Sequence, residues 1–160
     1  EVTPQNLLAR PQAALQALGL SARKVDYMRG IARQVVDGEL DLPGMAALED
    51  AEVCRRLSAL RGIGVWTAEM LLLFSLQRPD ILSYDDLAIR RGLRMLYRHK
   101  EMPRERFERY RRRFSPYGSL ASLYLWAIAG GALPQLDDPA ERGKGGVRPS
   151  GRGRGTPVKS

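Results

Sequence analysis

The sequence predicts an all-α protein with one main domain, and three observations support this prediction. Apolar residues recur at helical spacing along most of the chain, whereas no segment alternates strictly enough to be a strand. Serine, aspartate, proline and glycine stand where these helices would begin and end. The 160 residues are 44% hydrophobic, which is enough for one compact core.

The N-terminal part is predicted to be helical throughout. Residues 4–18 form one or two short helices that are interrupted near Pro11, and Gly19 ends them. Ser21 then caps a longer helix, which Gly38 ends. The apolar face of this helix has the i, i+3, i+4, i+7 spacing and consists of Val25, Met28, Ile31, Ala32 and Val35.

The centre of the chain is predicted to hold a helix, a tight turn and a second helix. Asp50 can cap the first helix. The apolar face of that helix is formed by Val53, Leu57 and Leu60. Residues 61–64 then turn the chain into an almost wholly apolar helix from Val65 to about Leu76. A helix that is apolar on all sides is expected to be buried.

A loop and two further helices follow. The loop begins at residues 79–80 and ends at the acidic pair Asp85 and Asp86, after which the helical pattern resumes over residues 87–97. Residues 103–114 form an arginine-rich helix, and solvation explains its outer face better than a contact with a charged partner does.

The last predicted helix is capped by Ser119 and ends near residues 130–131. Residues 134–160 are rich in glycine, proline and arginine and contain little that could be buried. We therefore expect a helical domain over residues 1–133 and a disordered basic tail over residues 134–160. The charge of this tail could add nonspecific attraction to DNA.

Composition restricts the partners and the compartment. The formal net charge of +8 favours a polyanion as partner, although an arginine-rich proteome would give a similar surface. The single cysteine, Cys54, excludes an iron–sulfur cluster, which needs four thiolates, and a disulfide within the chain. No apolar run approaches the roughly 20 residues that a membrane span needs. No signal-peptide pattern opens the sequence, so we expect a soluble cytoplasmic protein, associated with the nucleoid if the source is bacterial.

The most specific motif lies in residues 60–68, Leu-Arg-Gly-Ile-Gly-Val-Trp-Thr-Ala. Gly62 and Gly64 can adopt backbone conformations that other residues avoid, so the turn can direct backbone N–H groups at an anion beside the next helix. A Gly-x-Gly pattern alone is usually only a tight turn. Here Asp86 follows Trp66 by 20 positions, at the predicted start of another helix.

This combination resembles the helix-hairpin-helix (HhH-GPD) DNA glycosylases, and among them the 3-methyladenine DNA glycosylase II type. The resemblance covers most of the chain. Besides the hairpin and the acids, it includes residues 19–24, 37–42, 115–119 and 123–126. A helix and a separate domain that precede this region in the family have no counterpart here. The resemblance therefore implies a helical domain truncated at its N-terminus.

The resemblance implies that Asp86 is the catalytic residue, because the essential acid of the family directly precedes the Leu-x-Leu/Ile-Arg-Arg helix start. Asp85 is the alternative. Breaking an N-glycosidic bond builds positive charge on the deoxyribose, which a fixed carboxylate stabilises. The N–H groups at a helix start favour a negatively charged aspartate. The two acids could instead serve only as an N-cap.

The resemblance also indicates the reaction type. Glycosylases with lyase activity carry a nucleophilic lysine two residues after the second hairpin glycine, where this chain has Trp66. No lysine lies between Lys24 and Lys100. We therefore expect a monofunctional enzyme that releases alkylated purines such as 3-methyladenine and 7-methylguanine and leaves the strand intact.

Four residues are expected to line the pocket for the damaged base, namely Trp66, Met70, Leu87 and Tyr117. The face of Trp66 could attract the positive charge of an alkylated purine, or Trp66 could be only a core residue. The residues expected to contact the DNA phosphate are Arg61, Gly62, Ile63, Gly64 and Thr67.

The expected partner is duplex DNA with alkylated bases, bound by a monomer. The resemblance implies no required cofactor, although hairpin carbonyls can hold a monovalent cation. The alternative function is a noncatalytic helix-hairpin-helix DNA-binding module. Such a module has no need of a carboxylate near the DNA, where it repels phosphate.

Overall fold

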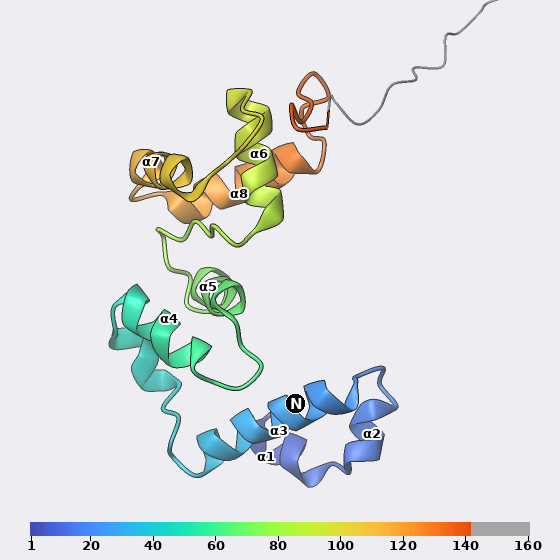
Figure 1. Cartoon of the computed structure of the whole chain (residues 1–160). Coiled ribbons are helices and arrows are strands. Elements are labelled where there is room, and N and C mark those ends of the chain that lie inside the picture. Colours follow the sequence, from blue (N-terminus) through green and yellow to red (C-terminus); the bar gives the residue numbers. More distant parts are fainter. Residues whose placement is uncertain (142–160) are drawn as a thin grey trace, which may run out of the picture.

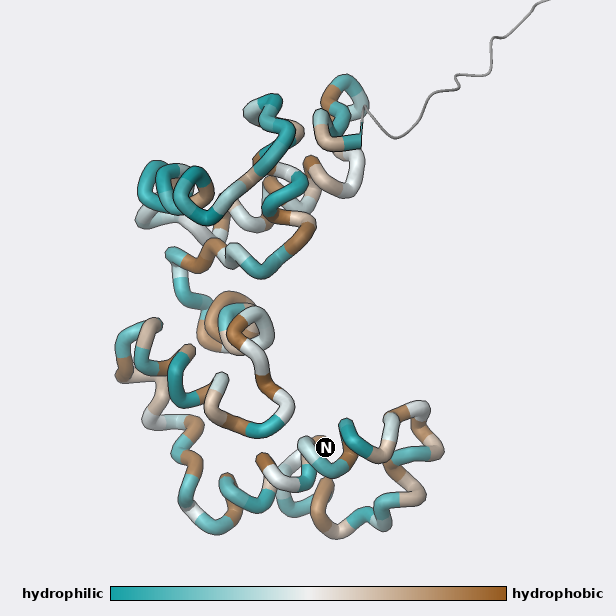
Figure 2. Tube along the Cα trace, in the orientation of Figure 1, coloured by the Kyte–Doolittle hydropathy of each residue, from teal (hydrophilic) through white to brown (hydrophobic). Residues whose placement is uncertain are grey.

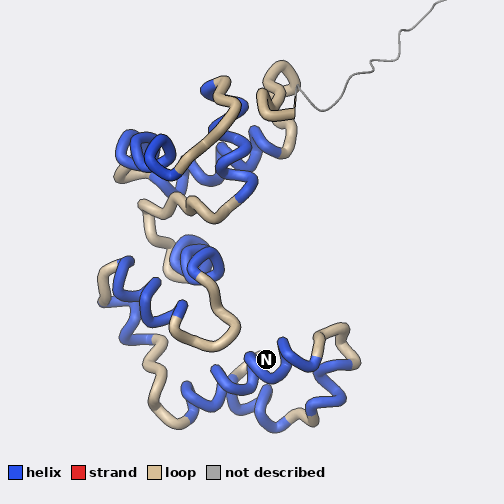
Figure 3. Tube along the Cα trace, in the orientation of Figure 1, coloured by secondary structure: helices blue, strands red, loops and turns tan. Residues whose placement is uncertain are grey.

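The structure, a computed structural model, describes residues 1–141, which form eight α-helices, one 3₁₀ helix and no strand (Figure 1, Figure 3). The all-α prediction is therefore confirmed. None of the helices in this part of the chain is long and apolar enough to cross a membrane.

Two short helices, α1 (Pro4–Ala9) and α2 (Gln12–Gln16), lie against α3 (Ala22–Val36). As predicted, Ser21 caps α3, because its Oγ accepts a hydrogen bond from the backbone N–H of Lys24 at 3.3 Å. The Arg29 side chain on α3 fixes α1 by donating hydrogen bonds to three of its last carbonyl oxygens, those of Leu7, Leu8 and Arg10.

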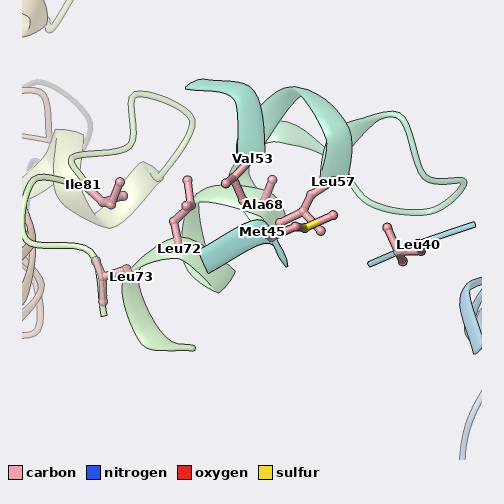
Figure 4. Close-up of a cluster of buried hydrophobic side chains, with 8 residues drawn as sticks. All are labelled: Leu40, Met45, Val53, Leu57, Ala68, Leu72, Leu73 and Ile81. Atoms are coloured by element: carbon pink, nitrogen blue, oxygen red, sulfur yellow. The ribbon is translucent and has the colours of Figure 1, made fainter. Parts of the chain in front are cut away.

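The central helices pack around the first hydrophobic cluster. The 3₁₀ helix η1 (Pro43–Ala47) leads into α4 (Asp50–Ser58), which packs against α5 (Val65–Phe74). Figure 4 shows the buried side chains, which are Leu40, Met45, Val53, Leu57, Ala68, Leu72, Leu73 and Ile81. Asp50 is the first residue of α4 and not its cap, because its carboxylate pairs with Arg78 at 3.2 Å.

Helix α5 is buried only in its middle, so the prediction of a wholly buried helix is wrong. Ala68 and Leu72 face the core, whereas the side chains of Val65, Trp66 and Phe74 are exposed at the two ends. In Figure 2, where α5 is seen nearly end-on, the brown of hydrophobic residues predominates in this helix. The neighbouring helices therefore leave apolar side chains uncovered at the first and last turns of α5.

The C-terminal helices α6 (Leu87–Tyr97), α7 (Arg104–Phe114) and α8 (Gly118–Ala129) enclose a second cluster. Its buried members are Leu82, Ile89, Leu93, Met102, Phe107 and Leu125. Gly92 permits the close packing of α6 on α8, because a Cβ at this position would lie 2.4 Å from the carbonyl oxygen of Leu125. Trp126 packs against both clusters and therefore joins α8 to the central helices.

The prediction that Ser119 caps α8 is wrong, because Tyr117 occupies the N-cap position. The Ser119 Oγ instead accepts a hydrogen bond from the backbone N–H of Ile81 at 3.0 Å and donates one to the carbonyl oxygen of Arg78. Ser119 therefore joins the start of α8 to the loop that follows α5.

The predicted tail begins too early, because residues 134–141 belong to the described structure. Asp138 is only 2% exposed and forms an ion pair with Arg94 on α6, at 2.5 Å between Nη2 and Oδ2. The hydrogen bond from Arg94 is the main reason that the pKa of Asp138 is lowered. Residues 142–160, the rest of the predicted tail, lie outside the described residues.

Candidate active site

The centre of the site is the carboxylate of Asp86, which is held at two points. Asp86 is 7% exposed and caps α6, because its Oδ1 accepts a hydrogen bond from the backbone N–H of Ile89 at 2.9 Å. Its Oδ2 accepts a hydrogen bond from the indole Nε1 of Trp66 on α5 at 3.0 Å. The carboxylate therefore serves as an N-cap and also joins two helices.

The geometry favours Asp86 over Asp85 as the candidate catalytic residue. The Asp86 carboxylate lies at the N-terminus of α6, whose free backbone N–H groups provide partial positive charge. Asp85 is exposed and takes part in no hydrogen bond or ion pair within residues 1–141. Of the two acids, only Asp86 is held rigidly enough to stabilise charge at a fixed position.

Of the four predicted pocket residues, Trp66 contacts this carboxylate and Leu87 follows it directly in the chain. Trp66 is 45% exposed, which excludes the interpretation that it is only a core residue. Met70 is half-buried one turn further along the same face of α5. Leu87 follows Asp86 directly and is 73% exposed. Trp66 and Leu87 are therefore two exposed apolar side chains next to the carboxylate.

Tyr117 is not placed with this group. It is 66% exposed and lines two surface pockets, one of them together with Phe74, and neither pocket is lined by Trp66 or Asp86. Phe74 lies eight residues after Trp66, about 12 Å along the helix. The position of Tyr117 follows from Asp80, whose side chain accepts hydrogen bonds from its neighbours Ser115 (Oγ, 2.6 Å) and Gly118 (N, 2.9 Å).

The hairpin between α4 and α5 depends on one of its two glycines for its shape. Gly62 has a φ of +93°, and a Cβ there would lie 2.2 Å from the ring of Tyr27 on α3. Gly64 has an ordinary φ of −90°, and a Cβ there would meet no atom within 4 Å. The prediction of a special conformation is therefore confirmed for Gly62 and wrong for Gly64.

Helix α3 supports the hairpin through Arg61. The guanidinium of Arg61 lies over the ring of Tyr27, 5.4 Å from its centroid, and pairs with Asp26 at 3.5 Å. The Arg61 side chain is nevertheless 80% exposed and so is accessible to an anion.

The start of α5 is a potential anion site. No side chain caps this helix, and within the described residues the backbone N–H groups of Val65, Trp66 and Thr67 donate to no protein acceptor. Free N–H groups at a helix N-terminus bind anions such as phosphate. The N–H of Ile63 is not free for an anion, because it donates to the carbonyl oxygen of Leu60 at 3.1 Å, and the Ile63 side chain packs against the first hydrophobic cluster.

Glu69 is a charged residue of the site region that sequence analysis missed. It is the only charged residue in the apolar helix α5, and this isolation is the signal that could have revealed it. Its carboxylate accepts a hydrogen bond from the Oγ of Ser83. Burial raises the pKa of Glu69, and the hydrogen bond from Ser83 opposes this effect.

The site region holds no evident metal cluster. Among residues 1–141, no group of three or more His, Cys, Asp or Glu side chains is arranged to hold a metal ion. Cys54 is a free, half-buried thiol whose pKa is raised by burial and by the nearby charge of Glu69.

Comparison with known proteins identifies the family. The DNA-3-methyladenine glycosylase 1 of Schizosaccharomyces pombe is 36% identical over 126 residues, which are 78% of this chain and 55% of that protein. The crystal structure of a DNA-3-methyladenine glycosidase from Bacillus halodurans matches with a TM-score of 0.74 and 36% identity, over 84% of this chain and 63% of that one.

A 3-methyladenine DNA glycosylase of Schizosaccharomyces pombe, solved in complex with abasic DNA, matches with a TM-score of 0.70 and 35% identity, over 78% of this chain and 62% of that one. The chain spans about half the length of the curated relative that it matches. The model of the HhH-GPD superfamily of base excision DNA repair proteins matches residues 1–116, well over half of the chain. The chain therefore belongs to the HhH-GPD superfamily of base excision DNA repair proteins.

Proposed function

We propose that this protein is a monofunctional DNA glycosylase, which hydrolyses the N-glycosidic bond of alkylated purines in duplex DNA and leaves an abasic site. The observation that carries this proposal is the Asp86 carboxylate, which is held by the N-terminus of α6 and by the indole of the half-exposed Trp66. The names of the relatives, which are 3-methyladenine DNA glycosylases, support it.

The proposed reaction uses Asp86 as a fixed negative charge. The bond between C1′ and the purine nitrogen breaks, and the base leaves with the bonding electrons, so the positive charge passes from the alkylated base to the deoxyribose. Asp86 stabilises this charge without having to reorient, because Ile89 and Trp66 already hold its carboxylate. A water oxygen then bonds to C1′ and releases a proton to solvent. In this proposal, the main role of Asp86 is to stabilise the positive charge of the sugar, and the removal of the proton from water is secondary.

The hairpin and Trp66 bind the substrate in this proposal. A base must leave the stack before it can be excised, and this costs less for a damaged pair. The free N–H groups of Val65, Trp66 and Thr67 bind a phosphate beside the lesion. The exposed face of Trp66 then attracts the positive charge of the alkylated purine.

A monovalent cation at the hairpin fits this arrangement. Within the described residues, the backbone carbonyl oxygens of Arg61, Gly62 and Ile63 accept no hydrogen bond and can therefore act as ligands. A bound cation would bring positive charge close to the DNA phosphate. The reaction at Asp86 requires no other cofactor.

The proposal is tested by incubating the chain with duplex DNA that has been treated with a methylating agent. We expect release of free 3-methyladenine and 7-methylguanine, detected by chromatography, and binding of duplex DNA by a monomer. If the folded chain binds the DNA but releases no base, it is a noncatalytic DNA-binding module.

Borohydride should trap no covalent complex between the protein and its substrate. Trp66 occupies the position of the Schiff-base lysine in the lyases, so this position offers no amine that could attack C1′. Strands should break only after treatment with alkali. Electrophoresis of borohydride-treated reactions checks this, and a crosslink that maps to any lysine of the chain contradicts the monofunctional mechanism.

Replacing Gly64 with valine should weaken the binding of damaged and undamaged duplexes by roughly 10- to 100-fold, the range for a lost hydrogen bond to a charged group. The variant should fold normally, because a side chain at Gly64 meets open space. Gly62→Ala, in contrast, should lower the thermal stability, because its Cβ collides with Tyr27.

The salt dependence of binding separates the N–H contacts from the charged ones. Neutral N–H groups displace few counterions, so Gly64→Val should leave the slope of log affinity against log salt almost unchanged. If Arg61 contacts a phosphate, Arg61→Ala should flatten this slope by about 0.9. Equal affinity of the wild type and Gly64→Val for DNA would show that the hairpin is only a turn.

A further inference from the structure

Buried Ser83 and half-buried Glu69 form a polar pair that the proposed reaction does not use. Ser83 lies in the loop that leads to Asp86, and its side chain is completely buried. Its Oγ donates a hydrogen bond to Oε2 of Glu69 on α5. The pair therefore attaches this loop to α5 from within the protein.

This attachment lies beside the one made by the catalytic carboxylate. Glu69 follows Trp66 by three residues on α5, and Asp86 follows Ser83 by three residues in the loop. Residues three apart on a helix are neighbours on one face. The hydrogen bonds from Trp66 to Asp86 and from Ser83 to Glu69 therefore join the same two segments at adjacent points.

A charged carboxylate at position 69 lowers the stability of the folded protein, because it is partly removed from water. Burial raises its pKa, and the charge of Asp85 adds to this effect, while Arg104 and Arg111 on α7 oppose it. A buried ionisable group destabilises a protein unless specific partners compensate for its lost hydration. An apolar residue would pack into the otherwise apolar helix without this cost, so the structure indicates a role for the acceptor oxygen of Glu69.

We propose that Glu69 is a positioning residue for Asp86: by accepting the Ser83 hydroxyl, it fixes the loop so that the Asp86 carboxylate meets the indole N–H of Trp66. The inference rests on the proposed glycosylase function for its catalytic consequence. Its structural part, the control of the bond from Trp66 to Asp86, is independent of any activity.

The kinetic test compares Glu69→Ala, Ser83→Ala and the double variant. Each should lower the single-turnover rate of base release by about 10- to 100-fold, as small misplacements of a catalytic group do, without weakening DNA binding. The double variant should be no slower than either single variant, because both remove the same hydrogen bond. Glu69→Gln should retain most of the rate, because its amide oxygen can still accept from Ser83.

The matched control is Glu105→Ala, which removes an exposed glutamate in the first turn of α7. This variant should behave like the wild type. Thermal melts identify any variant that fails to fold, and Glu69→Leu, which is similar in size but lacks an acceptor, then replaces Glu69→Ala.

The second readout is the indole N–H resonance of Trp66 in a proton–nitrogen correlation spectrum, assigned with Trp66→Phe. It should shift in Glu69→Ala and Ser83→Ala but not in Glu69→Gln or Glu105→Ala. An unchanged resonance in folded Glu69→Ala overturns the inference, whatever the activity. If the wild type releases no base but the resonance shifts as described, the proposed function fails and the positioning role stands.

Discussion

Replacing Asp86 with asparagine is expected to lower the single-turnover rate of base release by about 100- to 1,000-fold, as the loss of one preorganised electrostatic group does. Asparagine keeps the shape of the side chain and can still accept the N–H of Ile89 through its amide oxygen. The charge is lost, and so is the acceptor for the Trp66 indole N–H, because the amide nitrogen then faces that donor. Both changes affect the transition state more than the binding of DNA. DNA affinity should therefore remain close to that of the wild type.

Asp85→Asn is the matched control, because it removes the same charge from the neighbouring residue. Asp85 is exposed and makes no hydrogen bond within the described residues, so its loss should have a small effect. Rates measured under single-turnover conditions for both variants check the assignment. If Asp85→Asn is the inactive variant and Asp86→Asn is nearly normal, Asp86 is not the catalytic residue.

Substitution of Trp66 is expected to have the second largest effect, because its side chain has two roles. Trp66→Phe removes the hydrogen bond to Asp86 but keeps an aromatic face. Trp66→Leu removes both. A cation–π contact is worth roughly 0.5–2 kcal/mol, so Trp66→Leu should be roughly 2- to 30-fold slower than Trp66→Phe on cationic 7-methylguanine.

The comparison between substrates separates the two roles of Trp66. On a neutral damaged base such as hypoxanthine, the phenylalanine and leucine variants should differ little, because no positive charge faces the ring. Competition between the two substrates in one reaction measures this difference. An equal loss of activity on both substrates would mean that the ring of Trp66 does not select cationic bases.

Local features of the fold could be predicted from the sequence. The Ser21 cap, the start of α6 at Asp86 and the positive φ of Gly62 depend on a few neighbouring residues, and the structure confirms all three. The pairing of Trp66 with Asp86 was accessible only through the family resemblance, because 20 residues separate the two side chains.

The remaining features depend on contacts between distant segments. Tyr117 is placed by Asp80, and Ser119 bonds to the loop after α5 instead of capping its own helix. Asp138 is buried because it meets Arg94, so residues 134–141 pack where composition alone predicted disorder. No local pattern could have shown these pairings. The pairing of Glu69 with Ser83, which lies 14 residues away, was equally hidden, although the isolation of Glu69 in an apolar helix marks the residue itself.

The most direct test of the central claim measures how strongly Asp86 binds positive charge at the sugar. The ligands are two duplexes, one with a cationic pyrrolidine ring in place of the deoxyribose and one with an uncharged tetrahydrofuran ring. The wild type should bind the cationic duplex about 100-fold more tightly or better, as expected of a transition-state analogue. Asp86→Asn should lose most of this preference. If the wild type and Asp86→Asn prefer the cationic duplex equally, Asp86 is not the charge that stabilises the deoxyribose as the base leaves.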